Sequence, residues 1–346
     1  PTMILRTTDG GATWAPQAPE MAGTLQSVWF KDANNGFAVG RDDSLGYSRG
    51  ILFRTNNGGT TWTKHALLTR GQLNDVSFAD ANNGVAIGSG QDSLWNQSAF
   101  IFRTTDGGST WKSWAIRGGM ELTGVSLPGV STGTVVGTAW GYSSSSGMIF
   151  HTTDGGVTWG SQLGTTEDLL DVSFIDNQTG MAVGYNGTIL RTHNGGVSWI
   201  GSHSGTTKGL FGISVHDGNS ATAVGDSGTI LRTEDGGSTW QRQTSGTGCN
   251  LRGIYFIGSS FGIAVGDSGT ILRTIDGGAT WVDRSVHRDA SLHGAFFADA
   301  TTGLVVGGLD SAYPSKALIY RTTDGGETWS RAIIDTLTSL SAVSFF

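Results

Sequence analysis

Residues 7–14 read Thr-Thr-Asp-Gly-Gly-Ala-Thr-Trp, and variants of this octapeptide occur eight times along the 346-residue chain. The copies end at Trp14, Trp62, Trp111, Trp159, Trp199, Trp240, Trp281 and Trp329. Successive tryptophans are 40 to 49 residues apart, which is the length of one four-stranded blade of a β-propeller. This repeat, and not the overall composition, decides the predicted fold class.

Each repeat divides into four short apolar runs. In one copy the runs are 251–256, 261–266, 270–274 and 280–283, and they are rich in β-branched residues with Gly, Asp or Asn between them. We therefore predict an all-β protein, with one β-propeller domain over residues 1–346. The predicted blades cover 25–66, 73–115, 122–163, 169–203, 210–244, 251–285 and 292–333.

The two ends of the chain bear on the number of blades. Residues 3–7 match the third strand of a repeat, and residues 340–346 match a first strand. We expect the ends to share a seam blade, residues 1–18 plus 340–346, which would close the ring without an open edge. Its missing second strand would lie outside this sequence. This count favours eight blades; the alternative is seven blades with the first hairpin as an overhang.

The octapeptide itself predicts a tight, structural turn. Its glycine pair allows positive φ, and its Asp side chain can accept hydrogen bonds from N–H groups of the same turn. A single functional site would not need eight copies, so we expect all boxes to be scaffolding. The residues concerned are Asp9, Asn57, Asp106, Asp154, Asn194, Asp235, Asp276 and Asp324, with the eight tryptophans packing beside their own blade or the next. An arginine that recurs in the third strand, as in Arg232, is expected to contact the neighbouring blade.

These residues carry a resemblance to a known family. The pattern Thr-x-Asp-x-Gly-x-Thr-Trp resembles the Asp-box, or bacterial neuraminidase repeat. Residues 262–281, GIAVGDSGTILRTIDGGATW, resemble the photosystem II stability and assembly-factor-like propellers. The resemblance covers essentially the whole chain. It implies a propeller, commonly of seven blades, and an assembly factor that holds a membrane-protein intermediate, a role associated with a basic patch.

Charge and composition exclude several function classes. The net charge is −7 and lysine is rare, whereas nucleic-acid binding needs a dense basic face; the acidity also argues against the photosystem role specifically. No apolar run approaches the roughly 20 residues of a membrane span. Cys249 is the only cysteine, so neither an internal disulfide nor a cysteine metal cluster can form. No leader is visible, and we predict an extracytoplasmic protein that is periplasmic, cell-surface or secreted.

Four long loops suggest where a partner binds. The connections between second and third strands are long at 41–50, 89–99, 138–147 and 308–317. Loops carry function more often than scaffolds do, and aromatic side chains are favoured binding anchors. The predicted binding residues are Tyr47, Trp95, Trp140, Tyr142 and Tyr313, with Arg252 and His293 as further candidates at the central end of the same face. The alternative is that each aromatic ring only packs its own loop down. Arg70 and Gln72 lie near that central end, and we expect them to belong to a polar channel mouth.

A hydrolase is the main competing class. A sialidase needs three arginines, a Tyr–Glu pair and an Asp acid, but Glu20, Glu121 and Glu167 are the only glutamates outside the boxes. An inverting pair, as in xyloglucanase-like propellers, stays open, with Asp75, Asp168 and Asp171 as candidates. We predict a non-catalytic binding or assembly module without a cofactor, for a protein partner or an extracellular assembly. A glycan partner, a glycoside hydrolase and a membrane-complex assembly factor are the alternatives, and a calcium ion in the acidic turn 41–44 is left open.

Overall fold

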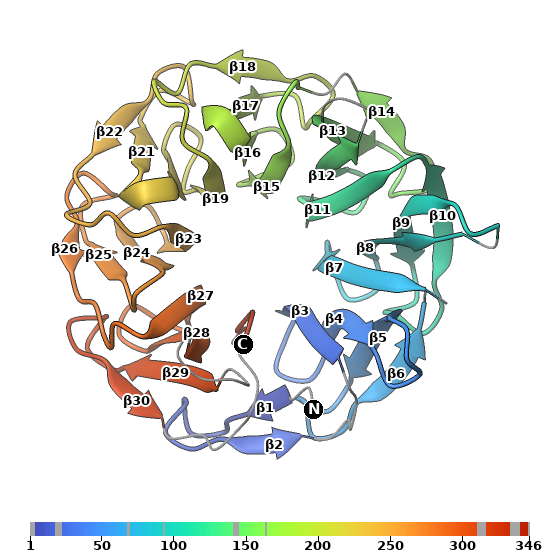
Figure 1. The fold of residues 1–346 in the computed structure, drawn as a ribbon, viewed down its shortest axis with the longest axis horizontal. Coiled ribbons are helices and arrows are strands. Elements are labelled where there is room, and N and C mark those ends of the chain that lie inside the picture. The colour runs from blue at the N-terminus through green and yellow to red at the C-terminus, as the bar shows by residue number, and fades with distance from the viewer. Residues whose placement is uncertain are drawn as a thin grey trace. The chain divides into compact units, whose positions relative to one another are not determined.

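The computed structural model describes residues 4–17, 23–67, 70–92, 94–140, 145–162, 165–309, 316–332 and 340–344. It contains seven four-stranded antiparallel sheets and one two-stranded sheet (Figure 1). The chain divides into two compact units. One consists mainly of residues 20–202, and the other of residues 203–346 together with the first hairpin, residues 3–19.

The unit of residues 20–202 holds four of the four-stranded sheets. The first two are β3 (Gly23–Phe30), β4 (Gly36–Asp42), β5 (Arg49–Thr55) and β6 (Thr63–Ala66), then β7 (Gly71–Phe78), β8 (Gly84–Gln91), β9 (Gln97–Thr104) and β10 (Lys112–Arg117). The next two are β11 (Met120–Ser126), β12 (Gly133–Trp140), β13 (Ser145–Thr152) and β14 (Gly160–Gln162), then β15 (Leu169–Phe174), β16 (Gly180–Gly184), β17 (Ile189–Thr192) and β18 (Ile200–Ser202). Figure 1 shows the first strands β3, β7, β11 and β15 along one edge of this unit.

The other unit holds the remaining three four-stranded sheets and the hairpin. The sheets are β19 (Leu210–Val215), β20 (Ala221–Gly225), β21 (Ile230–Thr233) and β22 (Gln241–Gln243); β23 (Leu251–Ile257), β24 (Phe261–Gly266), β25 (Ile271–Thr274) and β26 (Val282–Asp283); and β27 (Ala290–Phe297), β28 (Gly303–Leu309), β29 (Ala317–Thr322) and β30 (Ser330–Ala332). The hairpin pairs β1 (Ile4–Arg6) with β2 (Ala15–Gln17). Short 3₁₀ turns, η1 (Tyr185–Gly187) and η2 (Asp226–Gly228), replace the long loops of other blades.

The core lies between the faces of neighbouring sheets. Phe37 and Val39 of β4 pack with Val76 and Phe78 of β7 in one cluster, which also receives Trp111 from the box of the second blade. The second strands β8 and β12 are buried along most of their length because a neighbouring sheet packs on each of their faces. The burial of both faces explains why these strands read as continuous apolar runs.

Every first strand of a blade carries a register shift just after its leading leucine. Such a bulge re-aims one side chain, and here the re-aimed side chain contacts the next blade. Asn74 Nδ2 donates to Leu122 O at 2.7 Å, and Thr123 Oγ1 donates to Leu169 O at 2.9 Å. At these two positions the bulge therefore links its blade to the leading leucine of the next one.

The preference for eight four-stranded blades is wrong. Where an eighth sheet was expected, the described residues form only the β1–β2 pair, and residues 340–344 are not in a strand. The physical reason is that a second strand must bridge the first and third strands of a blade, and the sequence given supplies none at this position. The sharing of one blade between the two ends, and the closure of the ring, stay predictions.

Both ends nevertheless pack on the sheet β27–β30. Leu5 and Trp14 of the hairpin contact the same apolar cluster as Leu340 and Val343, and Arg321 Nε donates to Gly10 O at 2.5 Å. The Asp box of the hairpin thus binds a recurring strand arginine, Arg321 of β29, as boxes of four-stranded blades do.

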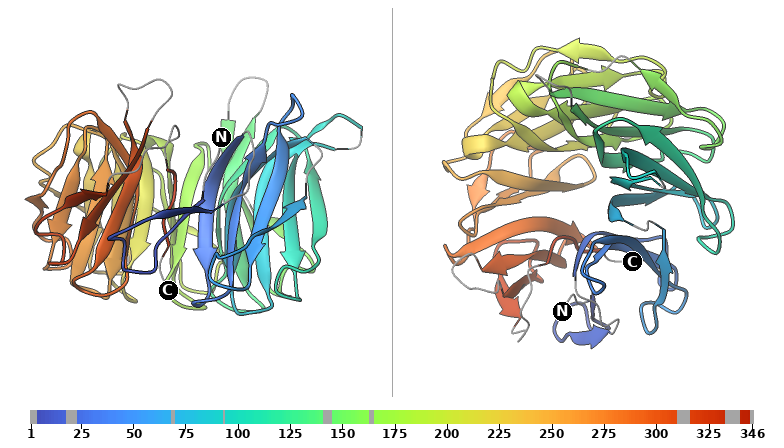
Figure 2. Two further views of the ribbon diagram at one scale, coloured as in Figure 1. Left: turned by 90° about the horizontal axis from the view of Figure 1, so that it is seen from below. Right: turned by 45° about the vertical axis from the view of Figure 1, so that its right-hand side comes forward.

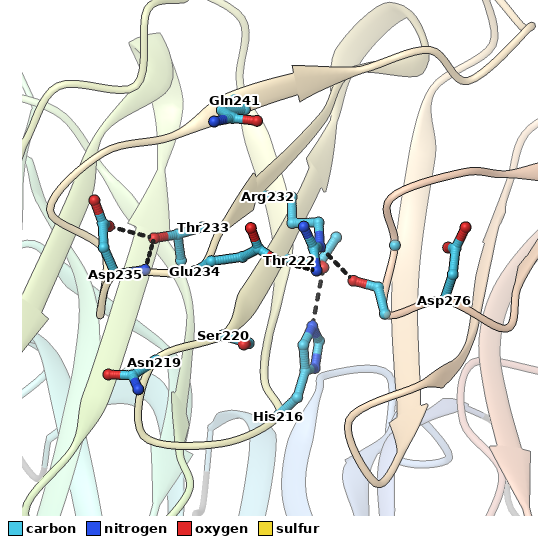
Figure 3. Close-up of polar contacts among 12 residues, drawn as sticks. His216, Asn219, Ser220, Thr222, Arg232, Thr233, Glu234, Asp235, Gln241 and Asp276 are labelled. Carbon is cyan, nitrogen blue, oxygen red and sulfur yellow. Dashed lines mark hydrogen bonds and ion pairs between the residues drawn. The ribbon is translucent and has the colours of Figure 1, made fainter.

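The Asp boxes form the turns that the sequence predicts. Asp235 Oδ1 accepts a hydrogen bond from the Thr233 hydroxyl at 2.8 Å (Figure 3). The same oxygen accepts from the N–H of Thr239 at 2.8 Å, and Oδ2 accepts from Thr239 Oγ1 at 2.7 Å. Bonds from the Thr239 backbone and then its hydroxyl lower the pKa of Asp235 to about 2. Gly236 and Gly237 both have positive φ, at 67° and 78°, as a turn without Cβ atoms allows.

In four blades the recurring arginine, Arg103, Arg232, Arg273 or Arg321, binds the box of the neighbouring blade. Arg232 Nε donates to Gly277 O of the next sheet at 2.6 Å, and Arg273 Nε donates to Gly325 O at 2.5 Å. Figure 3 shows Arg232 extending from its strand toward the neighbouring box of Asp276. The arginine is therefore a neighbour-to-neighbour contact, as its repetition at one strand position indicated.

Candidate functional site

The candidate site lies at the end of the sheets opposite the Asp boxes, in the unit of residues 20–202. The left view of Figure 2 shows the strands standing upright, so the connections lie at the two ends of each sheet. The β4–β5 and β8–β9 loops and the β6–β7 connection meet at one end and enclose a pocket of about 310 Å³. Its lining residues are Tyr47, Ser48, Arg70, Gly71, Gln72, Ser89, Gly90, Gln91, Gln97 and Trp140.

The centre of the site is the guanidinium group of Arg70. Its Cζ atom lies 4.8 Å from the ring centroid of Tyr47 and 4.4 Å from that of Trp95, within the range of cation–π attraction. Trp140 lines the same pocket. The rings are open to solvent: Trp95 is 63% exposed, Trp140 53% and Tyr47 38%. Three of the five predicted aromatic residues are thus brought together.

Close backbone packing positions Arg70. The N–H of Gly71 donates to Ser48 O at 2.9 Å, and the N–H of Gln91 donates to Arg70 O at 3.0 Å. Gly71 has φ of +137°, and a Cβ atom there would collide with the carbonyl oxygen of Ser89. The β6–β7 connection is therefore fastened to both loops, and glycine is required where the backbones touch.

The β8–β9 loop holds Trp95 in a left-handed conformation with φ of +68°. Asp92 organises this loop: its Oδ1 accepts from the N–H of Leu94 at 2.8 Å and of Asn96 at 3.0 Å. The N–H of Trp95 donates to Asp92 O at 3.0 Å. Positive φ is costly for a bulky residue and is found where the surroundings over-determine it, so the indole is presented by a structured turn.

Acidic residues near the site are already paired. Asp42 binds Lys64, Asp43 lies 3.3 Å from Arg41, and Asp92 lies 3.4 Å from Arg117. Within the described part of the chain, no ion pair joins Arg70. The pocket therefore presents a cation over two aromatic rings, and the described residues of the neighbouring loops provide no counter-ion for it.

The acidic turn 41–44 does not gather metal ligands. The N–H of Ser44 donates to Asp42 Oδ1 at 2.9 Å, and the Ser48 hydroxyl donates to Asp43 at 2.7 Å. Throughout the described ranges, no group of three or more His, Cys, Asp or Glu side chains is placed to hold a metal ion.

Two further candidates make contacts within the other unit. Arg252 forms a bidentate pair with Asp267, at 2.5 and 3.1 Å. His293 Nδ1 lies 3.1 Å from Leu340 O, the same bulge contact that Asn74 and Thr123 make. Tyr142 and Tyr313 lie outside the described residues.

Two of the three hydrolase candidates, Asp75 and Asp171, accept hydrogen bonds within the scaffold, whereas Oδ1 of Asp168 is buried without a hydrogen-bond partner among the described residues. Asp75 accepts from Ser27 Oγ at 2.9 Å on one side and from the N–H of Val125 at 3.1 Å on the other, so it ties three sheets together. Burial raises the pKa of Asp75 to about 6. Asp171 accepts from the N–H of Val172 at 2.8 Å. Asp75 is therefore in the environment of a structural carboxylate rather than in an open cleft.

Arg70 and Gln72, which the sequence places near the central end of this face, both line the pocket. The sequence does not single out Gln91 and Gln97, which complete the lining. The usable signal was topological, because fourth-to-first connections share an end with second-to-third loops. The contact of Arg70 with Tyr47 and Trp95 depends on loop conformations, which the repeat pattern of the sequence does not predict.

Comparison with known proteins identifies the family. The family described as photosynthesis system II assembly factor YCF48 matches residues 160–243, 200–275 and 247–340. The chain belongs to this family. A search of curated proteins found no match. Of the residues that the structure describes, none form a helix long and apolar enough to cross a membrane.

Solved structures agree on the fold. A structure of YCF48 bound to D1 peptide is 20% identical, with a TM-score of 0.55, covering 75% of this chain and 80% of that one. YCF48 from Cyanidioschyzon merolae is 19% identical, with a TM-score of 0.59 and coverage of 89% and 96%. The GH74 enzyme of Niastella koreensis is 13% identical, with a TM-score of 0.55 and coverage of 99% and 67%. At these identities the likeness shows the fold alone, a single β-propeller of four-stranded blades.

Proposed function

We propose that this YCF48-family protein is a non-catalytic, extracytoplasmic assembly module that holds a polypeptide segment of a partner on the pocket around Arg70. The observation that carries the proposal is the position of Arg70 between Tyr47 and Trp95, beside the exposed Trp140. Exposed aromatic rings around an arginine are typical of binding hot spots. A relative whose structure contains a bound D1 peptide supports a protein as the class of partner.

The carboxylates favour binding over hydrolysis. A glycosidase needs two carboxyl groups that flank the scissile bond, whereas Asp75 accepts hydrogen bonds from Ser27 and Val125 between sheets. The likeness to a GH74 enzyme is one of fold at 13% identity. The pocket offers amide, hydroxyl and aromatic groups with one cation, which suits recognition of a peptide.

The test is affinity capture from an extract of the native host. Trp95→Ala/Trp140→Ala should lose the captured partner, because both substitutions remove exposed rings from the site. The matched control is Val157→Ala/Val197→Ala, which removes two exposed apolar side chains, 66% and 56% accessible, at the box end. The proposal fails if the tryptophan variant captures the same partners as the wild type, or if the control loses them equally.

A glycan is the second candidate partner, favoured by the same exposed tryptophans, because an indole face can stack on a sugar ring. Titration with xyloglucan oligosaccharides, monitored by the indole N–H signals in NMR spectra, separates the two. Saturable shifts at Trp95 and Trp140 would favour a sugar ligand over a polypeptide.

A further inference from the structure

We infer that the Arg70 pocket recognises a carboxylate, presented by an acidic side chain within an extended segment of the partner. The inference rests on the proposed function and adds the chemistry of the ligand. Its starting point is that the two rings which hold Arg70, Tyr47 and Trp95, lie within 5 Å of the guanidinium carbon.

Stacking leaves the edges of the guanidinium for hydrogen bonding. A guanidinium carries five N–H donors in its plane, and an aromatic ring contacts its face rather than those donors. Arg70 lines the pocket. A planar fork of donors matches the two oxygens of a carboxylate, and such bidentate pairs are the strong ones.

The surrounding charges make an external carboxylate the missing partner. Asp42, Asp43 and Asp92 are each committed to another cation, namely Lys64, Arg41 and Arg117. Glu121 accepts from Gln72 Nε2 at 3.3 Å and forms no ion pair with Arg70 within the described ranges. Arg70 forms no ion pair with the described acids, so its positive charge is available to an anion from outside the chain.

The rest of the lining fits a peptide that carries the acidic group. Gln91, Gln97 and Ser89 offer amide and hydroxyl groups, which can pair with peptide N–H and C=O groups. Trp140 is 53% exposed at the same pocket and offers an apolar surface for the residue beside the acidic one.

The experiment compares blocked peptides that differ at one atom group. The probes are acetyl-Gly-Phe-Glu-Phe-Gly-amide, its Gln counterpart, and the Gln peptide with a free C-terminal acid, titrated while indole N–H shifts of Trp95 and Trp140 are followed. The Glu peptide should bind at least ten-fold more tightly than the blocked Gln peptide. Arg70→Gln should abolish that difference, Arg70→Lys should keep part of it, and Arg288→Gln, at an exposed arginine of the other unit, should keep all of it.

Three results would overturn the inference: equal binding of the Glu and blocked Gln peptides, binding of neither, or a free-acid Gln peptide that binds as tightly as the Glu peptide. The last would assign the carboxylate to a chain terminus. Unchanged circular dichroism and Tm for Arg70→Gln exclude a folding defect. If the Glu and Gln peptides bind equally and Trp95→Ala abolishes the binding of both, carboxylate recognition is wrong but the proposed peptide-binding function stands. If the capture experiment fails, the proposed binding function itself is wrong.

Discussion

Phe174 packs so closely over Gly180 that a Cβ atom on the glycine would lie 2.6 Å from the phenyl ring. The two residues pair across β15 and β16, and the ring also meets Trp199 edge-on at 5.8 Å. Other blades repeat the arrangement with Phe30/Gly36, Phe78/Gly84, Phe256/Gly262 and Phe297/Gly303. The blade that begins at β19 has Val215 in place of the phenylalanine and Ala221 in place of the glycine. The smaller side chain on the first strand thus accompanies a larger residue on the second.

This complementarity predicts a strong coupling between the two positions. Gly180→Ala should destabilise the fold by about 1–3 kcal/mol, because overpacking forces the ring or the backbone to move. Phe174→Val should also cost stability through lost packing. The double variant should be more stable than the sum of the two single effects by about 1 kcal/mol, as measured by urea denaturation. Strict additivity would show that the pairing of Val215 with Ala221 is incidental.

The Asp box predicts that an amide can replace the carboxylate but an alanine cannot. Asp276 accepts from the N–H of Thr280 at 2.9 Å and from the hydroxyl of Thr274 at 2.7 Å. Asn57 accepts the equivalent N–H at 2.9 Å in its own box. Asp276→Ala should therefore cost about 1 kcal/mol, the usual size for a lost turn cap, while Asp276→Asn should stay near the wild type. The midpoints of urea-induced unfolding measure the difference. Equal midpoints for Asp276→Ala and Asp276→Asn would show that the hydrogen bonds of the Asp276 side chain do not stabilise the turn.

The box and the site differ in how much of them the sequence predicts. The box depends on contacts within eight residues, so the octapeptide predicts its turn, its hydrogen bonds and its position opposite the long loops. The gathering of Tyr47, Trp95 and Trp140 follows from loop lengths and topology. The stacking of Arg70 depends on how separate loops pack, whereas the positive φ of Trp95 accompanies the hydrogen bonds of Asp92 within its own loop. The number of blades depends on a non-local pairing between the chain ends, which a count of apolar runs overestimated.

Asp75 predicts an unusual contribution to the pH dependence of stability. Burial raises its pKa from 3.8 to about 6. Between these values the folded state keeps a proton that the unfolded chain has lost, so this contribution to stability is present below pH 4 and is lost as pH rises through 6. His216 opposes it: burial lowers the pKa of this imidazole from 6.5 to about 4, and its contribution grows as pH rises through the same window.

Asp75→Asn should therefore make stability rise more steeply between pH 4 and pH 6.5, since the opposing contribution of His216 is left, together with those of His65 and His151, whose pKa values burial also lowers. Two pKa units set an upper limit of about 3 kcal/mol on the difference between the variant and the wild type. Urea denaturation at half-unit steps of pH measures it, with Asp176→Asn, at an exposed loop carboxylate of the same unit, as the matched control. Parallel pH profiles for wild type and Asp75→Asn would show that Asp75 titrates normally.

Trp95 predicts that stability and binding can be separated at one position. Its φ of +68° is a conformation that costs an L-residue about 1–2 kcal/mol and glycine almost nothing. Trp95→Ala and Trp95→Gly both remove the ring over Arg70, so both should lose the partner. Trp95→Gly should nonetheless be more stable than Trp95→Ala by about 1 kcal/mol, because glycine tolerates the left-handed turn that Asp92 organises. Thermal unfolding of the two variants side by side measures the difference. A Trp95→Ala protein as stable as Trp95→Gly would mean that the loop relaxes once the indole is gone, and that the indole rather than the turn imposes the left-handed conformation.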